Sequence, residues 1–281
     1  MIFRKVLFAM PAIIALGLVA AVTVASQPLP ADAADEQVRK VRTLKDPEIV
    51  ESSGLALSLY RNKRLWTHND SGGGPRLYAI GKRGQTTGRY YLENARAWDW
   101  EAMASAKRNK KKYLFVGDIG DNREWKPTIF VHRIREPKPS APNGRRDPAS
   151  YELKYPDGAH DAEALLVRPG TLRIYIVTKV KDGPGHIYVA PKNPSQRHVN
   201  RLKKIGKVPS VITDGVFLNR DRFVLRSHGS GYLYRKMGVR PKRFSLPHSG
   251  ESIARSPRPR YVLIGSEGRS SGIWRVRLPA R

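Results

Sequence analysis

The sequence predicts an all-β protein, a β-propeller with five blades. The first support is an acidic residue in front of a short apolar run, a pattern that occurs five times. The five segments are "ESSGLAL" (51–57), "WDWEAMA" (98–104), "HDAEALL" (160–166), "ITDGVFL" (212–218) and "GESIA" (250–254). The second support is that no convincing amphipathic helix lies between residues 34 and 281. The third is the order of further strand-like runs, because repeated units of three or four strands are typical of propellers.

Each acidic segment is followed by two more runs that are rich in Val, Ile, Leu, Tyr and Phe. Gly-rich polar turns separate these runs, as expected for antiparallel hairpins. The second runs are 64–68, 113–118, 173–179, 222–226 and 260–265. The third runs are 77–80, 129–134, 186–190, 232–235 and 273–278. Weaker runs at 88–94 and 150–155 are candidates for fourth strands.

The ends of the chain are predicted to meet. The last repeat stops after its third strand, whereas "QVRKVRTL" (37–44) precedes the first acidic segment and belongs to no repeat. We therefore expect residues 37–44 to form the fourth strand of the last blade and to close the ring. A six-bladed ring with one degenerate blade is the alternative. A β-sandwich is less favoured, because it does not require an acidic residue before every third or fourth strand.

Residues 1–33 have the pattern of a secretory signal peptide, which leaves residues 34–281 as a single propeller domain. A basic start precedes an apolar run at 6–25, and "ADA" (31–33) is a cleavage site of the A-x-A kind. We therefore expect a secreted protein, extracellular or associated with the cell envelope. A retained membrane anchor is the alternative, because the apolar run is about long enough to span a bilayer. The chain has no cysteine, which excludes a lipid-anchored lipoprotein, disulfides and thiolate zinc sites.

The acidic residues are predicted to form a ring. In a propeller the first strand of each blade lines the central channel, so its first residue lies at one mouth of that channel. The ring positions are Glu51, Glu101, Glu163, Asp214 and Glu251. Turns between second and third strands open on the same side and add Asp70 and Asp118.

Like charges this close repel one another, so the ring needs a neutralising partner. A Ca²⁺ ion is the simplest one, because it takes several oxygen ligands in flexible geometry. The alternative is that these acids accept hydrogen bonds from backbone N–H groups of neighbouring blades and act as structural latches.

Histidine and basic residues are also expected near this mouth. His68 and His160 lie in segments that face it and are candidates for general acid–base catalysis. Lys179 and Arg226, at the ends of second strands, and Arg123 are candidates for holding an anion.

The chain is strongly basic, with 52 Lys and Arg against 24 Asp and Glu, a net charge of +28. Five basic stretches fall in connections that a propeller places on the face opposite the acidic mouth: 61–64, 107–112, 135–146, 235–242 and 255–260. Such a face is expected to bind an anionic envelope polymer or lipid surface. A small anionic ligand is a further possibility, nucleic acid is an unlikely partner for an exported protein, and the chain is expected to be a monomer.

The order of these segments resembles a group of secreted bacterial propellers described as phytase-like or esterase-like. The segments that carry the resemblance are "ESSGLA", "HNDSGG", "AWDWEAMA", "VGDIGDN", "DAEALL", "VTK", "TDG", "GESIA" and "IGSEG", which together span about residues 49–275. Propeller phytases hold calcium ions in acidic clusters and grip phosphate with Lys and Arg. The resemblance therefore implies calcium at the acidic mouth and an anion-binding role for Lys179 and Arg226.

These observations support three functional hypotheses. The first is an exported binding or scaffold propeller with calcium or another cation at the channel mouth. The second is a calcium-dependent hydrolase of phosphoesters or other esters, in which a metal-bound water attacks with the help of His68 or His160. The third is a binder of envelope polymer that uses only the basic face.

Overall fold

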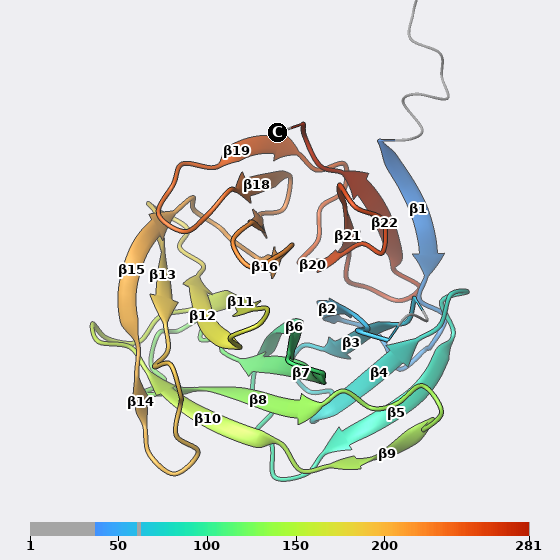
Figure 1. Cartoon of the computed structure of the whole chain (residues 1–281), viewed down its shortest axis with the longest axis horizontal. Coiled ribbons are helices and arrows are strands. Elements are labelled where there is room, and N and C mark those ends of the chain that lie inside the picture. Colours follow the sequence, from blue (N-terminus) through green and yellow to red (C-terminus); the bar gives the residue numbers. More distant parts are fainter. Residues whose placement is uncertain (1–36, 61–62, 281) are drawn as a thin grey trace, which may run out of the picture.

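The computed structural model describes residues 37–60 and 63–280, and every regular element in these residues is a strand. The strands form five sheets arranged around a central axis (Figure 1). The predicted five-bladed propeller is therefore confirmed, and the six-bladed alternative is wrong. The predicted signal peptide at 1–33 lies outside the described residues. Within the described ranges, no helix is long and apolar enough to cross a membrane.

In each blade one strand lies at the channel and the others follow outward. Blade 1 contains β2 (Ser52–Leu57), β3 (Leu65–Asn69), β4 (Arg76–Ile80) and β5 (Thr86–Leu92). Blade 2 contains β6 (Trp100–Arg108), β7 (Lys111–Asp118), β8 (Ile129–Arg135) and β10 (Ala149–Lys154). Blade 3 contains β11 (Ala162–Arg168), β12 (Arg173–Thr178), β13 (Gly185–Val189) and β15 (Lys203–Val208). Blade 4 contains β16 (Asp214–Phe217), β17 (Phe223–Arg226), β18 (Ser230–Tyr234) and β19 (Lys242–Ser245).

Blade 5 joins the two ends of the described chain. Its first three strands are β20 (Ser252–Arg255), β21 (Tyr261–Gly265) and β22 (Gly272–Arg277), and its fourth is β1 (Val38–Thr43). The N-terminal strand β1 pairs antiparallel with β22, with Val38 opposite Val276 and Thr43 opposite Gly272. The predicted closure of the ring by residues 37–44 is therefore confirmed.

Two short strands reach across from one blade to the next. β9 (Asn143–Arg146) comes from blade 2 and pairs parallel with β5 of blade 1. β14 (Asn200–Arg201) comes from blade 3 and pairs parallel with β10 of blade 2. The whole of 135–146 was expected on the basic face, but residues 143–146 instead run along the outer edge of blade 1. They cover unpaired backbone groups of an edge strand that would otherwise be open to association.

The core lies between neighbouring blades. Phe115 of blade 2 and Ile176 of blade 3 are buried in one such layer, and Trp66 of blade 1 is buried beside Leu114 of blade 2 in the next. The innermost strands are covered by neighbours on both sides, so they are almost continuously apolar or small, as in "SSGLAL" and "AEALLVR". The rigid packing of these strands fixes the positions of the residues at their ends.

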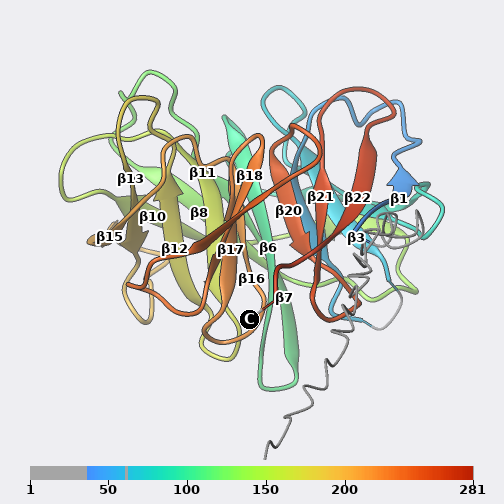
Figure 2. The same cartoon turned by 90° about the horizontal axis from the view of Figure 1, so that it is seen from above.

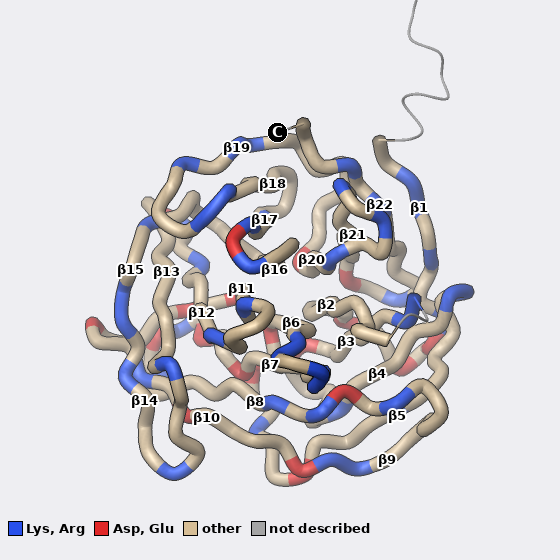
Figure 3. The backbone as a smooth tube through the Cα atoms, viewed as in Figure 1, with Lys and Arg blue, Asp and Glu red and all other residues tan. Residues whose placement is uncertain are grey.

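The five innermost strands run in the same direction along the channel (Figure 2). We call the end at which they start the acidic mouth and the end at which they stop the basic mouth. The hairpin between β6 and β7 carries "KRNKKK" (107–112) and projects at the basic mouth. Lys and Arg are not confined to this face, because the outer strands β1, β15 and β19 also carry them (Figure 3).

Candidate metal centre

Two buried glutamates, Glu101 and Glu163, are directed into the acidic mouth by β-bulges. The register of β6 against β7 shifts at Glu101, between Trp100 and Ala102. The register of β11 against β12 shifts in the same way at Glu163. An extra residue in a bulge is left unpaired and its side chain is redirected. Both glutamates are buried, at 4% and 3% exposure.

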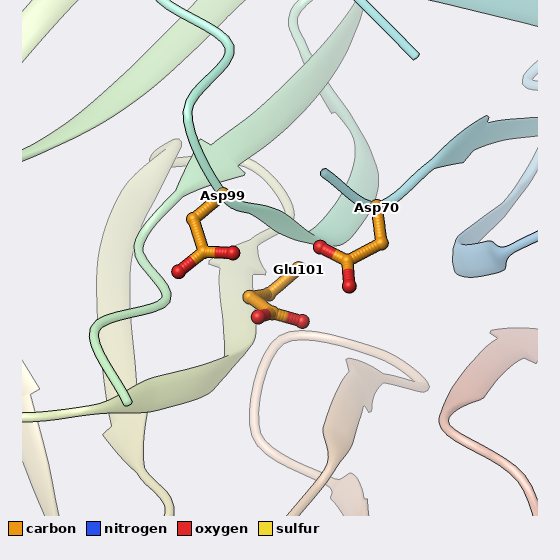
Figure 4. A group of neighbouring side chains, drawn as sticks. All are labelled: Asp70, Asp99 and Glu101. Carbon is orange, nitrogen blue, oxygen red and sulfur yellow. The ribbon is translucent and has the colours of Figure 1, made fainter. Parts of the chain in front are cut away.

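Carboxylates from four blades meet at this mouth. We call Asp70, Asp99, Glu101, Glu163 and Glu251 the carboxylate cluster. Asp70, Asp99 and Glu101 each offer an oxygen within 4.8 Å of the other two, and so do Glu101, Glu163 and Glu251. Figure 4 shows the carboxylates of the first group pointing toward one another. Glu101 belongs to both groups and therefore joins them into one site.

The loop after β7 passes close to the cluster at Gly120. A side-chain carbon at this position would lie 2.4 Å from Glu101 Oε1 and 2.7 Å from Asp99 Oδ2. The Gly120 N–H donates to the carbonyl oxygen of Asp99 at 3.3 Å. Only a residue without a side chain fits here without displacing the two carboxylates.

Two lysines contact the cluster from its sides. Lys179, which follows β12, forms an ion pair with Glu163 through Oε1. Lys126, in the loop after β7, lies 3.2 Å from Asp99 Oδ2 and also donates to the carbonyl of Gly120. These two cations balance only part of the negative charge, since the cluster contains five carboxylates.

Two buried oxygens of the cluster, Asp70 Oδ1 and Glu163 Oε2, have no hydrogen-bond partner among the described residues. A buried polar atom that loses water without gaining a partner is destabilising. A cation bound between these carboxylates would give both oxygens a partner.

Three carboxyls of the cluster, those of Asp70, Glu101 and Glu163, have a raised pKa and hold their protons more tightly than isolated carboxyls do. Burial, and then the charge of Asp70, raises the pKa of Glu101 well above its ordinary value. Burial raises the pKa of Glu163 to about 8, although Lys179 acts in the opposite direction. Burial and the neighbouring charge of Asp99 raise the pKa of Asp70 to about 6. A bound cation stabilises the ionised form and would compete with these protons.

Asp214 and Arg226 connect blades 4 and 5 instead of joining the cluster. The Asp214 carboxylate is fully buried, and one of its oxygens accepts the backbone N–H of Ile253 at 2.7 Å. Arg226 is 0% exposed, and its guanidinium donates to the carbonyls of Ser252 at 2.7 Å and Gly265 at 3.1 Å. The latch interpretation thus describes Asp214, and Arg226 presents no exposed surface to an anion.

The two histidines make their contacts with residues outside the cluster. His68 is fully buried, with its ring edge-on to Trp100 at 5.5 Å and Nδ1 2.8 Å from the carbonyl of Asn69. Burial lowers the pKa of His68 to about 4. His160 contacts Asp157 at 3.1 Å and the hydroxyl of Tyr188, a residue of β13, at 3.0 Å. These contacts do not place either imidazole on the carboxylates.

The remaining predicted residues border the mouth. Glu51 is exposed, and its carbonyl accepts the backbone N–H of Asp70 at 3.0 Å. Asp118 is buried and accepts the backbone N–H of Asp99 at 2.8 Å, so it supports a cluster residue. Arg123 is exposed in the loop after β7. One more carboxyl, that of Glu267 in the turn after β21, interacts with Glu251 of the cluster, and its pKa is raised to about 7, first by burial and then by Glu251.

Sequence reasoning missed two members of the site, Asp99 and Lys126. A signal for Asp99 was present, because "DWE" (99–101) and "DAE" (161–163) repeat the same D-x-E spacing in neighbouring blades. Lys126 had no comparable signal. Its ammonium reaches Asp99 only because the loop after β7 folds back over the mouth.

Similarity to known proteins is found among solved structures. No family model and no curated protein matches the sequence. A solved gluconolactonase from Xanthomonas campestris matches with a TM-score of 0.52 and 9% identity, over 86% of this chain and 89% of that one. Raptor from Chaetomium thermophilum matches with a TM-score of 0.45 and 9% identity, over 86% of this chain and 29% of that one. The WD40 repeats of RRP9 match with a TM-score of 0.40 and 14% identity, over 81% and 67%.

At such low identity the gluconolactonase likeness shows the fold alone. The chain is a β-propeller with a cluster of carboxylates, able to hold a metal ion, at one mouth of its channel. Because one fold supports many activities, the function has to be argued from the site.

Proposed function

We propose that this chain is an exported binding or scaffold propeller that holds Ca²⁺ at its acidic mouth. The observation that carries the proposal is the convergence of Glu101, Glu163 and Glu251 on one point, with a buried oxygen of Glu163 left without a partner among the described residues. Two oxygens that bind one calcium ion at about 2.4 Å are at most about 4.8 Å apart. The spacing within each group of the cluster satisfies this condition.

The donor set favours calcium over other ions. All of the ligands are carboxylate oxygens, the hard donors that calcium and magnesium prefer, and the chain has no cysteine. Five carboxylates from four blades suit the irregular, high coordination of calcium better than the octahedron and retained waters of magnesium. Bound calcium would supply positive charge at the mouth and a coordination position for an anionic or hydroxyl-bearing ligand.

We propose further that the basic face attaches the protein, as a monomer, to an anionic polymer or lipid surface of the cell envelope. The support is the net charge of +28 and the basic hairpins at the basic mouth. In this arrangement the acidic mouth faces away from the surface. Binding to envelope fractions that does not weaken as salt is raised would contradict this attachment.

A second candidate is a calcium-dependent hydrolase of phosphoesters or other esters, as the phytase-like resemblance suggests. The observation that favours it is that Lys126 and Lys179 stand beside the carboxylates, where they can hold an anionic substrate against the ion. The positions of His68 and His160 do not support their participation, so a cluster carboxylate would have to receive the proton from the attacking water.

Calorimetric titration and thermal unfolding test the cation site. We expect Ca²⁺ to bind the chelator-treated chain and to raise its unfolding midpoint, because a ligand that binds only the folded state adds about 2.7 kcal/mol at a hundredfold excess over Kd. Glu163→Gln should lose most of this rise. Glu93→Gln is the matched control, because Glu93 pairs with Arg145 on the outer strands, away from the channel.

The results separate the alternatives. Absence of both binding heat and midpoint shift in the unmodified chain would reject the cation site. If calcium binds, the chain should be assayed with phosphate and carboxylate esters. Turnover that Glu163→Gln and removal of calcium both abolish would establish the hydrolase, and binding without turnover would leave the scaffold function.

A further inference from the structure

The basic mouth of the channel contains a cavity of about 440 Å³. It lies where the innermost strands stop, at Leu57 of β2, Lys107 of β6 and Arg255 of β20, with Pro169 of the turn after β11 on another side. This volume is in the range of pockets that bind small molecules. The cavity is at the opposite end of the channel from the carboxylate cluster, so a ligand held there would bind independently of the cation site.

The cavity combines an apolar wall with positive charge. Leu57, Leu59 and Tyr60 supply part of the apolar wall, and Lys63 and Lys107 stand at its rim. None of the described residues that line it is acidic.

The surroundings of the cavity do not cancel this charge. The lining residue Leu59 is hydrogen-bonded to a carboxylate, that of Glu136. This carboxylate is buried and accepts the Leu59 N–H at 3.0 Å and Trp66 Nε1–H at 3.0 Å, so it is already occupied. A further cation, Lys112, lies 3.8 Å from the centre of the Tyr60 ring. The mouth therefore keeps a positive field over an apolar surface.

Arg255 is the most informative residue of the cavity. Its side chain is partly buried, yet its guanidinium has no hydrogen bond or ion pair with any residue in the described ranges. Burial lowers the pKa of Arg255, and no anion opposes this effect. A guanidinium is usually paired when it is taken out of water, because its five donors otherwise go unused. The Arg255 guanidinium is thus positioned to form an ion pair with a bound anion.

We propose that this cavity binds one amphiphilic anion, with its phosphate or carboxylate group on Arg255 and Lys107 and its hydrocarbon part against Leu57 and Leu59. The planar guanidinium suits bidentate contact with either group. Such an anion has two sources, the headgroup of an anionic lipid or a free amphiphile in solution.

Titration calorimetry with octyl phosphate, kept monomeric, tests the proposal at constant ionic strength. We expect one saturable site per chain, with inorganic phosphate and octanol each binding at least tenfold more weakly, because each lacks half of the recognised structure. Arg255→Gln should weaken octyl phosphate at least tenfold. Lys107→Gln should weaken it severalfold, and because Lys107 is exposed this variant remains informative if Arg255→Gln fails to fold.

Lys110→Gln is the matched control, since Lys110 is exposed in the same β6–β7 hairpin but does not line the cavity. Equal weakening by Lys110→Gln and Lys107→Gln would mean general attraction to a basic protein and would overturn the proposal. Inorganic phosphate that binds as tightly as octyl phosphate would overturn it too, because the apolar wall would then contribute nothing.

Vesicles distinguish the two sources once the site is established. If the anion is a lipid headgroup, octyl phosphate should displace the chain from phosphatidylglycerol vesicles and Lys107→Gln should reduce vesicle binding. If neither octyl phosphate nor Lys107→Gln changes vesicle binding, the ligand of the cavity is a soluble amphiphile.

Discussion

Glu101 and Glu163 occupy equivalent places in neighbouring blades, each as the second residue of an innermost strand and the extra residue of a bulge. Asp214 starts the innermost strand of the next blade, which pairs with its neighbour without a register shift. Its carboxylate turns to the backbone of blade 5 instead of the channel. In blades 2 and 3 the bulge therefore accompanies a glutamate that belongs to the cluster, whereas the strand of blade 4 that starts with the latch Asp214 has none.

Gly120→Ala should weaken calcium binding although it removes no ligand. The new methyl group would meet Glu101 Oε1 and Asp99 Oδ2, which are the ends of side chains and can move aside. We expect the chelator-treated variant to fold with little change in its unfolding midpoint, and its calcium affinity to fall roughly tenfold, about 1.4 kcal/mol. Calorimetric titration measures this, and unchanged affinity would mean that neither oxygen binds the ion.

Lys179→Met should strengthen calcium binding. The ammonium of Lys179 now competes with a cation for Glu163, so its removal should raise affinity severalfold. The same change should lower the unfolding midpoint in chelator, because Glu163 loses its partner. Lys181→Met, at an exposed neighbouring lysine, is the control. Weaker calcium binding in Lys179→Met would contradict the proposed arrangement of the site.

The chelator-treated protein should lose stability between pH 6.5 and pH 8. The pKa of Glu163 is about 8 in the folded chain against an ordinary value of 4.5. In this window the unfolded chain is already ionised at this residue, whereas the folded chain must give up a proton in a buried place. Glu163 alone should lower the free energy of unfolding by on the order of 2 kcal/mol as the pH rises.

The lower limit of this pH range, pH 6.5, is set by the buried imidazoles of His68 and His132. Burial lowers the pKa of His68 and His132 to about 4. Below pH 6.5 the unfolded chain therefore binds protons at these residues that the folded chain does not, which lowers stability and would obscure the effect. Chemical denaturation at several pH values measures the slope. Glu163→Gln should flatten it, saturating calcium should remove it, and calcium affinity should increase with pH. If Glu163→Gln leaves the pH dependence of the free energy of unfolding unchanged, a group other than Glu163 releases the proton.

Asp214→Ala should destabilise the protein without affecting calcium binding. It leaves the buried N–H groups of Gly215 and Ile253 without an acceptor, which should lower the free energy of unfolding by about 2–4 kcal/mol. Asp214→Asn keeps one acceptor oxygen and should lose less. Thermal unfolding with and without calcium compares the variants. If Asp214→Ala loses the calcium-induced rise, Asp214 is a ligand and the latch assignment is incorrect.

The repeat of acidic residues before apolar runs was enough to predict the blades and their order. Each such residue marks the start of an innermost strand, because the channel is the one place where every blade needs the same short apolar strand. The blade that ended after three strands lacked a fourth, and segment 37–44 was the one strand-like run left to pair beside β22.

The roles of individual acids could not be predicted in the same way. Glu163 faces the channel and Asp214 faces the backbone of the next blade because the strand registers differ. A one-residue bulge cannot be recognised from the amino-acid composition of a strand. The burial of Arg226 likewise depends on carbonyls of the following blade. Residues 143–146 gave no strand signal, because β9 is held by its partner β5 and not by its own sequence.

The pairing of β1 with β22 also bears on the order in which the molecule can be assembled. β1 precedes blades 1 to 4 in the chain and its partner β22 follows them, so the two strands are made at widely separated times. Blades 1 to 4 consist largely of consecutive hairpins and can form from local contacts, whereas blade 5 cannot be completed until β22 has been made. Such long-range pairing is slow. Until it occurs, both β1 and β22 present open edges, and this late step is the one most exposed to association between chains.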